Sequence, residues 1–159
     1  MSKLKERAHL AEITAKLRKK GKKVVFANGC FDVVHVGHAR FLKAAKAKGD
    51  VLVLGLNSDS SVRRLKGRGR PLVPEKERAE IMASFEAVDY IVIFRELTVD
   101  KTLEALRPYY HAKGTDYTKD TVPEKELAEK LGIKIAIVGD RKNHSTKDII
   151  KTVLEKEKK

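Results

Sequence analysis

Two histidines, His35 and His38, have the types and spacing best suited to chemistry on a phosphate in this sequence. Residues 23–27, Lys-Val-Val-Phe-Ala, precede them and are typical of a short buried strand, and residues 39–48 follow with apolar positions at helical spacing. Such a strand-to-helix turn places the first N–H groups of a helix, with their partial positive charge, at the carboxyl end of a strand. Gly37 lets an anion approach the backbone closely. We therefore expect a phosphate site at this turn.

The residues around the two histidines carry a longer pattern. Asn28-Gly-Cys-Phe-Asp32, followed by His35-Val-Gly-His38, resembles the GxFDxxHxGH element of the nucleotidyltransferase superfamily, which includes cytidylyltransferases and pantetheine-phosphate adenylyltransferase. Further segments between residues 23 and 153 resemble the adenylyltransferase domains of ADP-heptose synthases. They are Leu56-Asn-Ser-Asp59, Arg64-Leu-Lys66-Gly67, Arg70-Pro71 with Pro74 and Arg78, Phe85 to Tyr90, and Lys113-Gly-Thr-Asp116-Tyr117.

The resemblance implies an activity, which is transfer of the adenylyl group of ATP to heptose 1-phosphate with release of pyrophosphate. It also implies Mg²⁺, which would be held mainly through the nucleotide phosphates and not by side chains. The catalytic residues would be His35, His38 and Lys66. The residues at the nucleotide would be Cys30, Phe31, Gly37, Arg64, Arg70, Lys113, Gly114, Asp116, Ser145 and Thr146. The residues at the acceptor would be Asn28, Asp32 and Asn57.

This reaction requires little covalent work from the protein. The acceptor phosphate is already anionic, so its oxygen can attack the α-phosphorus of ATP in line without a general base. The two histidines would hold phosphate oxygens. Lys66, with Arg64 or Arg70, would bind the leaving pyrophosphate and stabilise its negative charge.

Several of these residues also have plain structural roles. We expect Asp32 to orient the turn by accepting backbone N–H groups, and Cys30 to pack behind the turn and not to act as a nucleophile. Asp116 could accept ribose hydroxyls or belong to an ordinary turn. Arg78 is expected to make an ion pair or packing contacts, and Asp59 to cap a helix.

One segment departs from the pattern of the related enzymes. They carry a Ser-Thr-Thr type sequence at the start of the last helix, where this chain has Asn143-His-Ser-Thr-Lys147. Ser145 and Thr146 at a helix N-terminus can still donate hydrogen bonds to phosphate, and Lys147 adds positive charge. This departure affects which nucleotide and which acceptor the protein would prefer.

The elements that must position these residues alternate along the chain. The predicted strands are 23–28, 51–56, 90–94, 109–112 and 134–138. The predicted helices are 2–20 with Ser2 as N-cap, 39–48, a short helix to residue 65, 75–87, 98–106 with Thr98 as N-cap, 124–131, and one from 145 that frays after 154. This alternation predicts one α/β domain, a Rossmann-like, doubly wound, five-stranded parallel sheet in the order 3-2-1-4-5. We divide the chain into a basic amphipathic helix at 1–22, the nucleotidyltransferase domain at 23–154 and a charged tail at 155–159.

Length and composition limit the classes of protein to consider. The chain has 159 residues, which suits one domain, and a formal net charge of +13. Nine Lys and Arg residues against two Glu lie within residues 1–23. No apolar run approaches the length of a membrane span and no secretory signal is evident, so we expect a cytoplasmic protein without a membrane partner. The single cysteine, Cys30, cannot form an internal disulfide.

The partners expected are ATP and a sugar phosphate, together with a second copy of the chain in a homodimer. A cytidylyltransferase for glycerol 3-phosphate or a related polyol phosphate, or an FAD synthetase-type adenylyltransferase, would use the same turn. A basic nucleic-acid-binding module is the alternative from another class. Few aromatic residues are available to stack on bases, so nucleic acid is the less favoured partner.

Overall fold

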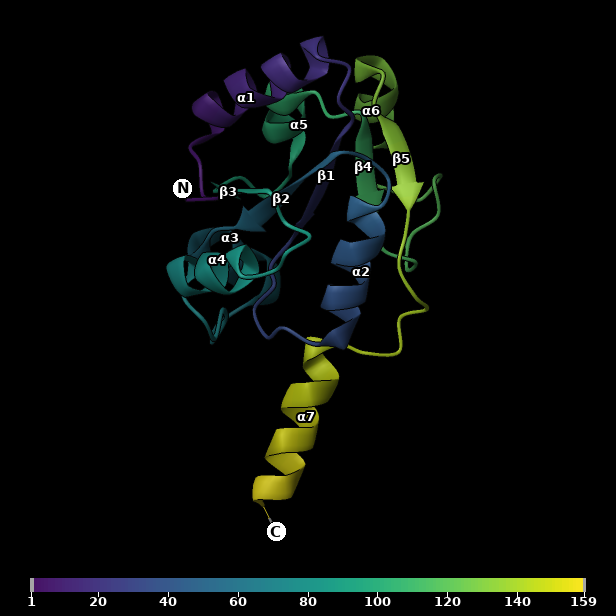
Figure 1. The fold of residues 1–159 in the computed structure, drawn as a ribbon. Coiled ribbons are helices and arrows are strands. Elements are labelled where there is room, and N and C mark those ends of the chain that lie inside the picture. Colours follow the sequence, from purple (N-terminus) through teal and green to yellow (C-terminus); the bar gives the residue numbers. More distant parts are fainter. Residues whose placement is uncertain (1, 159) are drawn as a thin grey trace.

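The five apolar runs form one parallel sheet in the predicted order β3-β2-β1-β4-β5, as the computed structural model of the chain shows for residues 2–158 (Figure 1). Within these residues the strands are β1 (Val24–Gly29), β2 (Val51–Asn57), β3 (Tyr90–Phe94), β4 (Tyr110–Lys113) and β5 (Lys134–Ile137). The helices are α1 (Arg7–Lys19), α2 (Val36–Lys46), α3 (Asp59–Lys66), α4 (Glu75–Ala83), α5 (Asp100–Leu106), α6 (Lys125–Leu131) and α7 (Thr146–Glu157). The predicted fold class is confirmed.

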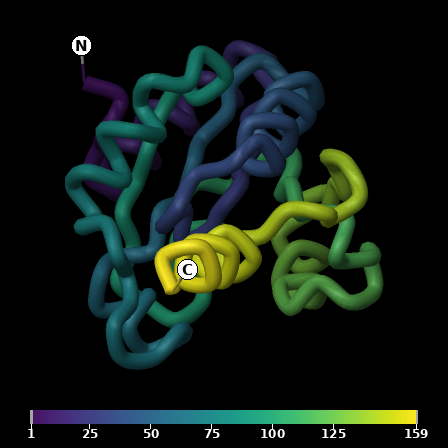
Figure 2. Tube along the Cα trace, turned by 90° about the horizontal axis from the view of Figure 1, so that it is seen from below, coloured from purple at the N-terminus to yellow at the C-terminus, as the bar shows by residue number. Residues whose placement is uncertain are grey.

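Two apolar clusters lie on opposite faces of the sheet. One joins α2 and α4 to the strands through Leu42, Ala45 and Met82, all fully buried. The other joins α1, α5 and α6 to the opposite face, with Leu10 and Leu103 at its centre. The central strands β1 and β2 are covered on both faces, so they are almost continuously apolar and not alternating. The parallel strands all end at one edge of the sheet. In the view from below, α7 is seen nearly end-on in front of the rest of the molecule (Figure 2).

The N-terminal segment differs from the prediction. Residues 2–6 are not helical: Lys3 and Lys5 pair with Ile91, whose N–H donates to Lys3 O and whose carbonyl accepts from Lys5 N, both at 2.9 Å. β3 is an edge strand with unpaired backbone groups, and this short extended segment satisfies some of them. Helix α1 therefore begins only at Arg7, and Ser2 is not its N-cap.

Other helix ends and caps also differ. Helix α4 ends at Ala83, four residues before the predicted end, and α2 begins at Val36 and not at residue 39. Ser58, and not Asp59, caps α3 by accepting a hydrogen bond from Ser61 N. Thr98 makes no cap, since α5 begins after Val99. The last helix continues to Glu157 without fraying at residue 155. Met1 and Lys159, the outermost residues of the segments 1–22 and 155–159, lie outside the described part of the chain.

Helix α7 extends away from the body of the molecule (Figure 1). None of its residues is buried, and the side chains of Val153 and Leu154 are more than half exposed. Its first residue is held to the body by a hydrogen bond from Thr146 Oγ1 to Val33 O. None of the helices within residues 2–158 is long and apolar enough to cross a membrane.

Candidate active site

The turn after β1 is built around a buried phenylalanine ring. Phe31 has a positive φ of 47°, and its ring packs against the ring of His38 with centroids 5.0 Å apart. Gly29 leaves room for this ring, because a Cβ at that position would lie 2.9 Å from Phe31 Cε2. The structure therefore places Phe31, predicted at the nucleotide, behind His38 as its packing support.

His35 and His38 both accept backbone N–H groups at the N-terminus of α2. His35 Nδ1 accepts from Gly37 N at 3.2 Å, and His38 Nδ1 accepts from His35 N at 3.3 Å. The two rings are stacked, with centroids 3.9 Å apart. A Cβ on Gly37 would lie 2.9 Å from His35 Cε1, so this glycine makes room for the ring of His35 itself.

These contacts determine the protonation of both rings. Burial, followed by the charges of His35 and Lys142, lowers the pKa of His38 to about 4. Burial, followed by His144 and Lys142, also lowers the pKa of His35. Both rings are thus neutral at pH 7. Because each Nδ1 accepts a backbone N–H, the single ring proton must lie on Nε2. The turn presents two neutral N–H donors beside a helix N-terminus.

Asp32 has a structural role, as expected. Its carboxylate accepts from Arg70 Nε at 2.6 Å, from Leu72 N at 2.8 Å and from Val73 N at 2.9 Å. Burial alone would raise the pKa of Asp32, but the two amides and Arg70 outweigh it and hold the pKa below its ordinary value. The carboxylate therefore fixes the loop at residues 70–73 to the turn, and it has little capacity left for the acceptor.

Arg78 lies fully buried beneath the site. It donates to Cys30 O at 2.6 Å, to Asn57 O at 2.8 Å and to Val73 O at 2.8 Å, and it pairs with Asp59 at 2.7 Å. One guanidinium thus holds together the ends of β1 and β2 and the starts of α3 and α4. This agrees with the ion pair expected for Arg78.

The three basic residues predicted to follow pyrophosphate are in different situations. Arg64 donates to Arg95 O at 2.6 Å, and Arg70 is paired with Asp32. Lys66, at the end of α3, is exposed and has no ion-pair or hydrogen-bond partner among residues 2–158. Burial raises the pKa of the Cys30 thiol, and the positive charge of Lys66 is the largest influence opposing it. Lys66 therefore has its charge near the turn, and Cys30 is not an activated nucleophile.

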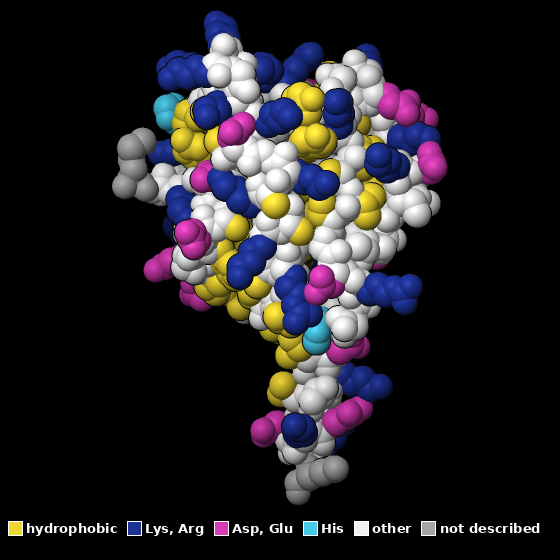
Figure 3. Space-filling view, turned by 45° about the vertical axis from the view of Figure 1, so that its right-hand side comes forward, with side chains coloured by type: hydrophobic (Ala, Val, Ile, Leu, Met, Phe, Trp, Pro, Cys, Tyr) yellow, Lys and Arg dark blue, Asp and Glu magenta, His cyan; other side chains and the backbone are white. Residues whose placement is uncertain are grey.

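The N-terminus of α7 meets the N-terminus of α2. Thr146 Oγ1 donates to Val33 O at 3.1 Å, and the rings of His144 and His35 lie 6.4 Å apart. Ser145 caps α7 by accepting from Asp148 N, and its hydroxyl donates to the Asp148 carboxylate. Both hydroxyls predicted to bind phosphate are thus used internally. Lys, Arg and His side chains lie close together where α7 joins the body of the molecule (Figure 3).

A hollow of about 330 Å³ separates α7 from the loop after α3. Its lining residues are Arg70, Lys147, Ile150, Lys151, Leu154, Glu155 and Lys158. The cations on this face of α7 lie beside the Asp32–Arg70 pair and add positive charge at the mouth of the site. The basic residues of α7 other than Lys147 were not predicted as site residues, because their helical spacing is equally typical of a solvated face.

The segment after β4 is arranged around two ion pairs. Lys113 is buried, with Nζ 3.6 Å from the Glu124 carboxylate and 4.7 Å from the centroid of the Tyr117 ring. Asp116 pairs with Lys142 at 2.9 Å, and a Cβ on Gly114 would lie 2.9 Å from the Asp116 carboxylate. Lys142, which also acts on the pKa of both histidines of the turn, is a residue that the motif did not reveal.

Two asparagines stand at the carboxyl ends of the central strands. Asn57 is buried and donates through Nδ2 to Ser61 Oγ at 2.9 Å, which leaves its amide directed at α3. Asn28 is partly exposed, and its Oδ1 lies 2.9 Å from Nε2 of His111. Of the two asparagines, Asn28 is the more exposed, and its Nδ2 has no hydrogen-bond partner among residues 2–158.

The donors on the protein do not form a metal cage by themselves. Within residues 2–158 no group of three His, Cys, Asp or Glu side chains is arranged to hold an ion. A divalent cation at this site would be held by phosphate oxygens and water, which is how Mg²⁺ is commonly bound beside nucleotides.

Comparison with known proteins gives concordant matches. The sequence model described as cytidylyltransferase-like matches residues 26–157. The bifunctional protein HldE of Pelobacter propionicus is 48% identical over 155 residues, and HldE of Geobacter metallireducens is 48% identical over 153 residues. These matches cover 98% and 96% of this chain but 32% and 31% of the relatives, so the chain spans about a third of their length. The crystal structure of the lipopolysaccharide core biosynthesis protein from Thermoplasma volcanium superposes with a TM-score of 0.64 at 29% identity, covering 74% of this chain and 97% of that one.

Proposed function

The chain belongs to the cytidylyltransferase-like family, and we propose that it transfers the adenylyl group of ATP to heptose 1-phosphate, releasing pyrophosphate. The observation that carries this proposal is the stacked pair of His35 and His38. Two neutral rings, each with its proton on Nε2, lie at the N-terminus of a helix and face away from the backbone groups that their Nδ1 atoms bind. This arrangement suits hydrogen bonds to phosphate oxygens.

The residues of the chain would act mainly by positioning and by electrostatic stabilisation. An oxygen of the acceptor phosphate forms a bond to the α-phosphorus while the bond to the pyrophosphate oxygen breaks. Nε2–H of the two histidines would donate to the phosphate oxygens, on which negative charge is spread in the transition state. Lys66, free of other partners in the described chain, would accompany the leaving pyrophosphate.

The sugar acceptor is inferred from two sources. The sequence segments around Arg64, Arg70 and Lys113 resemble those of ADP-heptose synthase adenylyltransferase domains, and the relatives named HldE match almost the whole chain. The solved relative is described as a lipopolysaccharide core biosynthesis protein. The positive charge near the turn fits an acceptor that is itself a phosphate.

Four further expectations belong to this proposal. Mg²⁺, held through the nucleotide phosphates, would neutralise charge on them when bound. We also expect a homodimer and a cytoplasmic location. The functional unit would be residues 23–154, with residues 1–22 and 155–159 as flanking segments.

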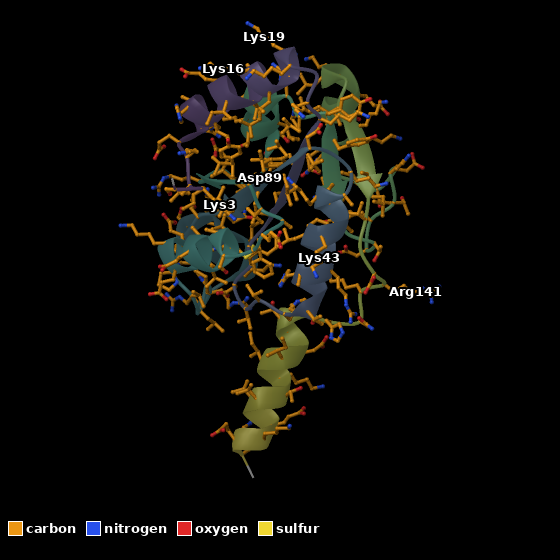
Figure 4. The ribbon with its side chains drawn as sticks, viewed as in Figure 1. Lys3, Lys16, Lys19, Lys43, Asp89 and Arg141 are labelled. Carbon is orange, nitrogen blue, oxygen red and sulfur yellow. The ribbon has the colours of Figure 1, made fainter. Side chains whose placement is uncertain are left out.

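The proposal is tested by measuring pyrophosphate release with ATP, CTP and GTP, each with heptose 1-phosphate and with glycerol 3-phosphate. We expect ATP with heptose 1-phosphate to be preferred. Strong selectivity for CTP with glycerol 3-phosphate would replace the proposed substrates by those of a polyol-phosphate cytidylyltransferase. Tight RNA binding with a steep salt dependence and no pyrophosphate release would instead favour the nucleic-acid-binding alternative. In that case Lys16 and Lys19, at the end of the molecule opposite α7, would be the first residues to test (Figure 4).

A further inference from the structure

A buried histidine lies beside the site without belonging to the motif. His111, in β4, is fully buried and stands opposite Phe26 in the register of β1 and β4. Asn28 is two residues after Phe26, so it lies on the same face of the sheet. His111 Nε2 is 2.9 Å from Asn28 Oδ1, while His111 Nδ1 is buried with no hydrogen-bond partner among residues 2–158.

The ring of His111 is held in place by its neighbours. Its centroid is 5.6 Å from that of Phe26. A Cβ on Gly55 would lie 2.5 Å from Phe26 Cζ, so the glycine in β2 is what allows the Phe26 ring to occupy this position. His111 is therefore fixed by packing, and its contact with Asn28 is correspondingly well defined.

The charge state of the ring follows from this burial. Burial, and then the positive charge of Lys113, lowers the pKa of His111 to about 3. The ring is neutral at pH 7 and has one N–H. That proton can lie on Nε2 or on Nδ1, and the choice is linked to the orientation of the Asn28 amide.

The two arrangements differ in what they leave unpaired. If Nε2 carries the proton, it donates to Asn28 Oδ1, and the unpaired buried atom is an acceptor, His111 Nδ1. If the amide of Asn28 were reversed, its NH₂ would donate to Nε2, and His111 would bury an unpaired N–H at Nδ1. Among backbone groups, an orphaned buried N–H is rarer than an acceptor without a partner, and we apply the same preference to the ring. The first arrangement is therefore favoured.

We propose that His111 is a positioning residue that donates through Nε2 to Asn28 Oδ1 and so holds the Asn28 NH₂ group toward the ligand side of the site. Asn28 Nδ2 has no partner among residues 2–158 and is not among the buried unpaired atoms, so it is accessible. It presents two donors, which suit an oxygen of an anionic or hydroxylated acceptor and discriminate against a donor group. The inference rests on the proposed function, since it concerns recognition of the acceptor.

The tautomer of His111 can be tested without any substrate. Long-range ¹H–¹⁵N spectra of the full chain, with His111→Phe used to assign the signals, should show a protonated Nε2 and an unprotonated Nδ1 for His111. A proton on Nδ1 would overturn the proposal. This result does not depend on which reaction the protein performs.

Steady-state kinetics test the consequence. In His111→Phe we expect the KM for heptose 1-phosphate to rise about tenfold, with the KM for ATP changed less than twofold, as for the loss of one oriented hydrogen bond. His111→Gln, whose amide nitrogen can replace Nε2, should restore most of the affinity. Val53→Ala, a buried change on the same sheet face, is the control for a merely structural effect.

The outcomes separate the two claims. If both KM values rise by the same factor in His111→Phe, the pattern expected of the structural control Val53→Ala, or if neither changes, His111 has no positioning role. If the wild-type protein releases no pyrophosphate with ATP and heptose 1-phosphate, the proposed function fails, while the spectra still decide whether His111 orients Asn28.

Discussion

At the scale of residues, the position of single protons decides what the site can do. His35 and His38 accept backbone N–H groups through Nδ1 and are neutral, so they offer N–H donors and not positive charge. The positive charge comes from other residues: Lys66 has no partner within residues 2–158, and Lys142 is paired with Asp116. Donors and cations are thus separate groups, arranged around one turn.

His38→Ala should lower kcat by about 10² to 10³, the usual cost of losing one preorganised donor to a transition state. The measurement is pyrophosphate release at saturating ATP and acceptor, with folding checked by circular dichroism. His9→Ala, an exposed histidine in α1, serves as the matched control and should retain full activity. A folded His38→Ala protein with kcat within threefold of wild type would show that this ring does not contact the reacting phosphates.

At the scale of elements, two buried charged groups assemble the site. Asp32 binds the loop at 70–73 to the turn, and Arg78 joins the ends of β1 and β2 to the starts of α3 and α4. A third connection, from Thr146 to Val33, joins α7 to the turn. These contacts connect segments far apart in sequence.

Arg78→Met should lower the free energy of unfolding by about 3–5 kcal/mol, because it leaves Asp59 and three backbone carbonyls without their donor. Urea denaturation measures the change. Arg63→Met, an exposed arginine in α3, is the control and should change stability by less than about 0.5 kcal/mol. Equal effects of the two substitutions would contradict the role assigned to Arg78.

Thr146→Val removes a hydroxyl while keeping the shape of the side chain. We expect kcat/KM to fall about tenfold, because the start of α7 loses its hydrogen bond to Val33 O and is held less firmly against the turn. Thr152→Val, an exposed position in the same helix, should have no effect. If the two variants behave alike, the contact between α7 and the turn is not needed for activity.

At the scale of the whole molecule, most of the architecture could be predicted from the sequence. The apolar runs indicate buried parallel strands, and the order 3-2-1-4-5 is confirmed. The extended path of residues 2–6 could not be predicted, because it depends on the unpaired edge of β3. The structural role expected for Asp32 is confirmed. Its ion pair with Arg70 and the hydrogen bond from Thr146 to Val33 are not visible in a motif, since each depends on a tertiary partner.

Stability of the whole molecule should fall as the pH is lowered from 6.5 toward 4. His38 and His111 have pKa values of about 4 and about 3 in the folded protein, below the ordinary 6.5. The unfolded chain therefore binds more protons in this range, and acid favours it. For His111 alone the loss is on the order of 3 kcal/mol across this range. Urea denaturation at pH 7, 6, 5 and 4 measures it, and the slope should be smaller in His111→Phe; equal slopes would contradict the burial of a neutral ring.

The most direct test of the central claim is the identity of the product formed by the wild-type protein. With ATP, heptose 1-phosphate and Mg²⁺, ³¹P NMR should show a sugar nucleotide with two coupled phosphorus atoms together with equimolar pyrophosphate. Formation of a cytidylyl product from CTP and glycerol 3-phosphate, with no product from ATP and heptose 1-phosphate, would contradict it.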